Sequence, residues 1–155
     1  GFDAGTYHIA LVISTLVGLA ANFGGGWLGS KWSIQRVMGI GMSVLAASLL
    51  VLPFAHTMLH VVLYAIAMGI AGGVVTVVFF SVWGQVFGRS HLGRIQGSAQ
   101  MMTVLASAVG PLLLAKTLER TGSYGPVFFV LAAIVALLGV ASWRVGLPLR
   151  KTVIL

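Results

Sequence analysis

The sequence predicts an all-α membrane protein, a polytopic bundle of five transmembrane helices. Three observations lead to this fold class. Of the 155 residues, 59% are hydrophobic and only 7% are charged, whereas soluble domains average roughly 45–50% apolar and about 25% charged residues. The mean hydropathy of +1.07 leaves too little polar sequence to cover a water-soluble fold. The apolar runs are continuous and do not alternate in polarity, which favours helices over the strands of a membrane barrel.

Charge-free intervals locate the spans, because a helix needs about 20 mostly apolar residues to cross the hydrocarbon core. Four such intervals occur, at 4–30, 37–88, 95–115 and 121–143. The second is long enough for two spans and divides near Pro53, where proline with His56 and His60 favours a turn. The sequence therefore predicts spans at roughly 7–28, 37–55, 59–87, 95–118 and 127–143, and a tail at 144–155.

Basic residues fall unevenly on the two sides of these spans. One side receives Lys31, Arg36, Arg89, Arg94, Arg144, Arg150 and Lys151. The other receives Lys116 and Arg120, offset by Asp3 and Glu119. The positive-inside rule then places the N-terminus outside the cell and the tail in the cytoplasm of a plasma or inner membrane. An odd number of spans with an external start and no preceding charged region predicts a fragment of a longer protein.

Several function classes are disfavoured. The formal charge of +7 does not indicate nucleic-acid binding, because the nine Lys and Arg residues lie between apolar runs and not on one soluble face. Cysteine is absent, and the pair His56 and His60 has no carboxylate or thiol nearby, so no metal site is predicted. The chain also lacks a nucleophile–base set and a phosphate-binding loop. We therefore expect neither an enzyme nor a cofactor.

Glycines recur four residues apart at Gly25/Gly29, Gly69/Gly73, Gly84/Gly88 and Gly93/Gly97. In lipid, small residues at this spacing let two helix backbones approach closely. The spacing predicts tight helix packing, and the alternative is that these positions let helices slide as a cavity opens. Pro111 lies inside the fourth span and predicts a kink there, because proline removes a backbone donor and clashes with the preceding turn.

Polar side chains within the spans are candidates to line a cavity, since such groups are costly in lipid and are often functional. Four of them step by four, three and four residues and so share one helical face: Gln96, Gln100, Thr103 and Ser107. Asn22, Thr76 and Trp83 complete the candidate set. Hydrogen bonds between helices remain the alternative role for these residues. No Asp, Glu, Lys or Arg lies deep in any predicted span.

The loops resemble those of one family. Residues 26–36, Gly-Trp-Leu-Gly-Ser-Lys-Trp-Ser-Ile-Gln-Arg, are similar to the loop motif of major facilitator superfamily transporters, roughly G-x-L-A-D-R-x-G-R-R. Gly26 and Lys31 match the motif in place or in charge, whereas Ser30 replaces its acid. Residues 87–97, which include Arg89 and Arg94, together with 108–111 and 121–124, resemble the region from the tenth to the twelfth helix. Their order and spacing resemble most those of the monocarboxylate and oxalate/formate antiporter-like branches of this superfamily.

The resemblance implies a partial major facilitator fold, helices eight to twelve of the C-terminal half. The first, third and fourth spans would then face a central cavity, and the second and fifth would face lipid. It further implies a secondary active antiporter or symporter that moves a small solute, with a small organic acid as the first candidate, by alternating access. The expected partners are the lipid bilayer, the missing N-terminal half, the solute and a coupling ion. A non-transporting membrane scaffold or sensor is the alternative.

Overall fold

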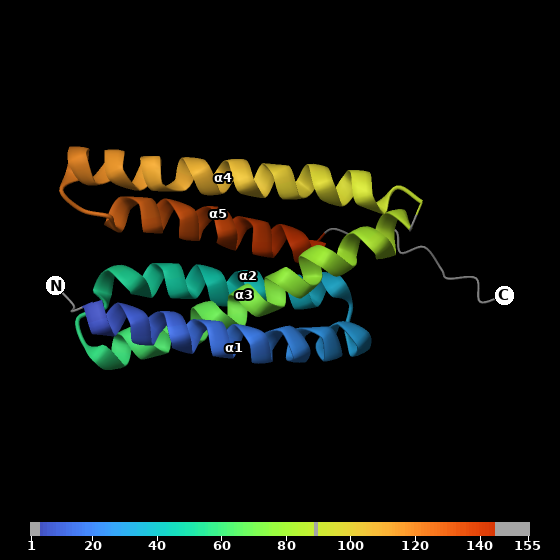
Figure 1. Ribbon diagram of the computed structural model, residues 1–155, viewed down its shortest axis with the longest axis horizontal. Coiled ribbons are helices and arrows are strands. Elements are labelled where there is room, and N and C mark those ends of the chain that lie inside the picture. The colour runs from blue at the N-terminus through green and yellow to red at the C-terminus, as the bar shows by residue number, and fades with distance from the viewer. Residues whose placement is uncertain (1–3, 89, 145–155) are drawn as a thin grey trace.

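The computed structural model describes residues 4–88 and 90–144. These residues form five α-helices and one 3-10 turn: α1 (Ala4–Lys31), α2 (Ile34–Val51), η1 (Leu52–Phe54), α3 (Met58–Phe87), α4 (Leu92–Thr121) and α5 (Gly125–Arg144). All five α-helices are long and apolar enough to cross a membrane. Successive helices run in opposite directions, so that their ends gather at two ends of the bundle (Figure 1). The predicted class and the predicted number of spans in this part of the chain are therefore confirmed.

The helices extend beyond the predicted spans at most of their ends. The first begins at Ala4 and ends at Lys31 instead of covering 7–28, and the fourth runs from Leu92 to Thr121 instead of 95–118. Hydropathy marks only the part of a helix that lies in hydrocarbon, whereas backbone hydrogen bonds continue into the headgroup layer, where charged residues are tolerated. The second is shifted instead: it starts at Ile34 and gives way to η1 at Leu52, one residue before Pro53.

Local signals explain where the helices stop and start. The side chain of Thr57 accepts a hydrogen bond from the backbone N–H of His60 and caps the first turn of α3. At the other end of α3, Gly88 has a φ of 73°, and Gly122 ends α4 with a φ of 68°. Glycine adopts this left-handed region without the steric penalty of a Cβ atom. The turns predicted from proline and glycine are therefore present.

Three pairs of helices carry most of the packing. The most extensive contact joins α1 to α3, and α2 packs against both α5 and α3. A small core of Ile34, Val37, Val74 and Val78 joins α2 to α3. By contrast, α4 has no buried residue. In Figure 1, α1 and α4 lie on opposite sides of the bundle, with α2 and α3 between them.

Close glycine packing occurs between α1 and α3. A Cβ atom added to Gly73 would lie 2.5 Å from the carbonyl oxygen of Gly18, and one added to Gly69 would lie 2.6 Å from that of Ser14. At Gly25, an added Cβ would make ordinary contact with the Cα of Val74, 3.4 Å away. The predicted tight packing is thus confirmed for the pair Gly69/Gly73. It is absent in the described residues at four other glycines of the predicted pairs, where an added Cβ would meet nothing within 4 Å: Gly29, Gly84, Gly93 and Gly97.

The fourth helix continues through its proline. The residues of α4 are helical without interruption from Leu92 to Thr121, with Pro111 inside. A kink at Pro111 stays a prediction.

Candidate functional site

A polar groove lies along the contact between α1 and α3. It has a volume of about 490 Å³. Its lining from α1 is Ser14, Thr15, Gly18, Leu19 and Asn22, and its lining from α3 is Met68, Gly69, Gly72, Gly73 and Thr76. The helices can approach at Gly69 and Gly73 because these residues have no side chain, and the polar residues flank this crossing. We name this surface the α1–α3 groove. It brings together Asn22 and Thr76, two of the residues that the sequence predicted as cavity lining.

The polar groups of the α1–α3 groove differ in how they are bonded. The hydroxyls of Ser14 and Thr15 both donate to the carbonyl oxygen of Leu11, at 3.0 and 2.8 Å. Within residues 4–88 and 90–144, no side-chain hydrogen bond is formed by Asn22 or Thr76. An amide offers two donors and an acceptor, and a hydroxyl offers one donor and two acceptor sites. Asn22 and Thr76 are therefore the groups that remain available to a polar ligand.

A second polar pocket follows on α1 and α3, with Ile34 of α2 at its edge. It has a volume of about 220 Å³. It is lined by Gly25, Gly26, Gly29, Ser30, Ile34, Val77, Val78, Ser81 and Gln85. Gly26 of the predicted loop motif belongs to this pocket. Polar surface between α1 and α3 thus extends from the middle of the bundle toward the end where α1 finishes.

The sequence signal for this lining was incomplete but present. The cavity set chosen from the sequence omitted Ser14 and Thr15. Ser14, Gly18 and Asn22 are spaced four residues apart, which places them on one face of α1. Polar and small residues at this spacing are therefore the signal that points to Ser14.

The polar row on α4 does not belong to the α1–α3 groove. Gln100, Thr103 and Ser107 are exposed, and Gln96 is half-buried. The hydroxyl of Thr103 donates to the carbonyl oxygen of Ala99 at 3.2 Å, and that of Ser107 donates to the carbonyl oxygen of Thr103 at 3.0 Å. Both bonds stay inside α4. The structure therefore does not bring this row together with Asn22 and Thr76.

Trp83 lies in an aromatic column on α3. Its ring makes an edge contact with Phe79, at 5.9 Å between centroids, and stacks on Phe87 at 6.3 Å. Its indole Nε1 is buried and has no hydrogen-bond partner among the described residues. Trp83 is not among the residues that line the α1–α3 groove.

The residues of the predicted loop motif gather at one end of the bundle. The Lys31 ammonium lies over the ring of Trp27, 4.2 Å from its centroid. Arg36 and Arg94 are exposed in the first turns of α2 and α4. Arg89 lies outside the described residues. The described part of the chain has one acid, Glu119, which lies in the last turn of α4 at the opposite end. The cations at the loop end therefore have no carboxylate partner among residues 4–88 and 90–144.

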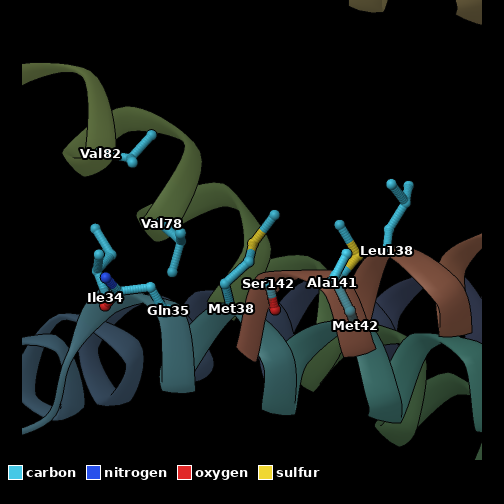
Figure 2. Close-up of a pocket in the computed structure, with 9 residues that line it drawn as sticks. All are labelled: Ile34, Gln35, Met38, Met42, Val78, Val82, Leu138, Ala141 and Ser142. Atoms are coloured by element: carbon cyan, nitrogen blue, oxygen red, sulfur yellow. The ribbon is translucent and has the colours of Figure 1, made fainter. Parts of the chain in front are cut away.

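A third cavity is apolar. It has a volume of about 430 Å³ and lies between α2, α3 and α5. The side chains that Figure 2 labels around it include Val78 and Val82 from α3, Met38 from α2 and Leu138 from α5. The Oε1 atom of Gln35 on its wall is buried without a partner among the described residues. The hydroxyl of Ser142 is already bonded to the carbonyl oxygen of Gly139 at 2.7 Å. Such a lining can contact hydrocarbon, but it offers few hydrogen-bonding groups to a polar solute.

The α1–α3 groove can therefore bind a small polar molecule by hydrogen bonds. Its side chains are hydroxyls, one amide, one thioether and one aliphatic group. Within the described ranges, no group of three His, Cys, Asp or Glu residues could hold a metal ion.

Comparison with known proteins gives one match. A sequence model of the Major Facilitator Superfamily matches residues 1–153. No curated protein and no solved structure matches the chain.

Proposed function

This chain belongs to the major facilitator superfamily, and from that membership we propose that it is the C-terminal part, helices eight to twelve, of a secondary active transporter. The family and the five apolar helices establish a multi-pass membrane protein of the transporter type. The proposal adds that it moves a small solute, with a small organic acid as first candidate. It does so by alternating access, rocking against an N-terminal half.

The observation that carries this proposal is the α1–α3 groove. Its amide at Asn22 and its hydroxyl at Thr76 lie in one groove, and neither has a partner in the described residues. Both groups can donate to the oxygens of a carboxylate, and such charge-assisted bonds are stronger than neutral ones. No cation lines the groove. A positive charge for an organic acid would come from the N-terminal half or from Lys116 on α4.

The polar row of α4 is the second part of the proposed cavity wall. Gln100 and Thr103 are exposed, and neither lines the α1–α3 groove. In the proposed transporter, the N-terminal half and a coupling ion or solute occupy the space that these side chains face. The α4 row would then contact water in one of the alternating states. The residues of α2 and α5 would face lipid.

The distribution of charge supports an orientation. Lys31, Arg36, Arg94 and Arg144 all lie at the same end of the bundle, while Lys116 and Arg120 lie near the other end together with Glu119. We propose that the end with Lys31 is cytoplasmic, in a plasma or inner membrane.

Uptake by the full-length protein in proteoliposomes tests the function. A panel of labelled small solutes, with small carboxylates first, should contain at least one that accumulates above protein-free vesicles. Asn22→Ala and Thr76→Val should each raise the solute concentration for half-maximal uptake about tenfold or more, because a hydrogen bond to a charged group contributes about 1.5–3 kcal/mol.

The matched control for these variants is Ser43→Ala. Ser43 lies on α2 outside the groove, and its hydroxyl donates to the carbonyl oxygen of Gly39 in its own helix at 2.8 Å. Uptake by this variant should equal that of the wild type. Absence of uptake for every solute, or equal uptake by Asn22→Ala and Ser43→Ala, would contradict the proposal. The alternative of a non-transporting scaffold or sensor predicts the first of these outcomes.

A further inference from the structure

A surface groove lies between α2 and α5 at the cation-rich end of the bundle. It has a volume of about 350 Å³ and is lined by Trp32, Arg36, Ile40 and Trp143. We name it the Trp–Arg groove. None of its residues lines the α1–α3 groove. It is therefore a separate feature from the proposed solute site.

Gly39 allows the Trp–Arg groove to form. A Cβ atom added to Gly39 would overlap Nε1 and Cδ1 of Trp143, so that the indole can lie across α2 only where this side chain is missing. One turn away along α5, a Cβ added to Gly139 would lie 3.2 Å from the Cβ of Met42. The two glycines thus let α2 and α5 approach, and Trp143 then closes one side of the groove.

Charge and exposure indicate what the groove binds. Arg36 is exposed, and the one acid in the described part of the chain, Glu119, lies at the far end of α4. The side chains of Trp32 and Trp143 remain 49% and 64% exposed, so that their rings face the surroundings of the bundle. In a chain that spans a membrane, tryptophan at a helix end lies at the level of the lipid headgroups. The lining of the groove is almost entirely apolar, so that its wall consists of the two indoles, Ile40 and the aliphatic stem of Arg36. The guanidinium of Arg36, at headgroup depth, has no carboxylate partner among residues 4–88 and 90–144.

We propose that an anionic phospholipid binds at the Trp–Arg groove, with its phosphodiester at the exposed guanidinium of Arg36 and the first part of an acyl chain in the apolar groove. Arginine can donate two parallel hydrogen bonds to a phosphate, and basic pockets between membrane helices bind anionic headgroups. The indoles flank the glycerol and, with Ile40, contact the first part of an acyl chain. A choline headgroup fits less well, because its ammonium carries the same sign of charge as Arg36. This binding does not depend on transport, so failure of one proposal leaves the other standing.

Native mass spectrometry of the full-length protein tests the site. The purified protein is incubated with equal amounts of phosphatidylglycerol and phosphatidylcholine, and the lipids retained are counted. The wild type should retain phosphatidylglycerol in preference. Arg36→Gln should lower this preference about fivefold, the loss expected for one cation next to an anionic lipid. Gly39→Ala should lower phosphatidylglycerol retention although Arg36 is intact, because it displaces the indole of Trp143.

Arg94→Gln is the matched control. It removes one charge at the same end of the bundle but outside the groove, and it should leave the preference unchanged. If Gly39→Ala does not fold, Trp143→Leu removes the ring without creating an overlap and should give the same loss. An equal loss in Arg36→Gln and Arg94→Gln would show attraction to diffuse charge and overturn the site. Equal retention of the two lipids by the wild type would overturn it as well.

Discussion

Substitution of Gly73 by alanine tests the closest contact in the bundle. The added Cβ would lie 2.5 Å from the carbonyl oxygen of Gly18 and 2.7 Å from the Cβ of Ala21. The first distance is about 1 Å shorter than ordinary van der Waals contact. Because the closest atom belongs to the backbone, no change of rotamer relieves the overlap, and α1 must move away from α3. Overpacking of this kind costs roughly 1–3 kcal/mol.

Thermal unfolding of the full-length protein in detergent measures this cost. Gly73→Ala should unfold at a lower temperature than the wild type. The matched control is Gly84→Ala on the same helix, where an added Cβ would meet nothing within 4 Å. That variant should be as stable as the wild type or more stable, since alanine is favoured over glycine in helices by up to about 1 kcal/mol. Adding Ala21→Gly to Gly73→Ala should not restore stability, because the overlap with Gly18 remains.

Equal unfolding temperatures for Gly73→Ala and Gly84→Ala would contradict this expectation. Such a result would mean that α1 and α3 lie farther apart than the structure places them. Full rescue by Ala21→Gly would likewise show that the side chain of residue 21, and not the backbone of Gly18, sets the distance.

Two further predictions concern α3 and α4. Thr103→Cys should react with a charged, water-soluble thiol reagent, because the reactive thiolate is favoured in water and disfavoured in apolar surroundings. Ala136→Cys on α5 should stay unmodified in lipid. Equal reactivity of the two variants would contradict the proposed cavity wall, and protection of Thr103→Cys would favour the scaffold alternative. Trp83→Phe should leave thermal stability in detergent unchanged or raise it, because it removes a buried N–H that has no partner in the described residues and that costs about 1–3 kcal/mol. A clear loss of stability in Trp83→Phe would show that the indole N–H is bonded in the full-length protein.

Much of the candidate site could be predicted from the sequence. Asn22 stood out as a lone amide inside an apolar span, and it lies in the α1–α3 groove. The spacing of Gly69 and Gly73 predicted a close approach of helix backbones. That approach occurs between α1 and α3, and both glycines line the same groove. Both signals depend on residue type and spacing along one helix, which are visible without a structure.

Other parts could not be predicted in this way. Gly93 and Gly97 have the same spacing as Gly69 and Gly73, but an added Cβ at either would meet nothing within 4 Å. Trp83 and Thr76 are both polar residues of α3, but Trp83 stacks among aromatic rings and Thr76 lines the groove. The indole of Trp143 packs against Gly39, and this contact joins α5 to α2, two helices that are far apart in the chain. Spacing along one helix carries no information about the helix that lies opposite.

The sequence by itself determined that the chain is a membrane protein, how many times the described part spans the bilayer and where its cations lie. These properties follow from the transfer of about 20-residue segments from water to hydrocarbon, which each segment undergoes independently of the others. Only the tertiary structure decided that α1 packs on α3 and that α4 has no buried residue. Between helices in lipid the hydrophobic effect no longer selects a face, so the partners are selected by the fit of surfaces such as Gly73 against Gly18.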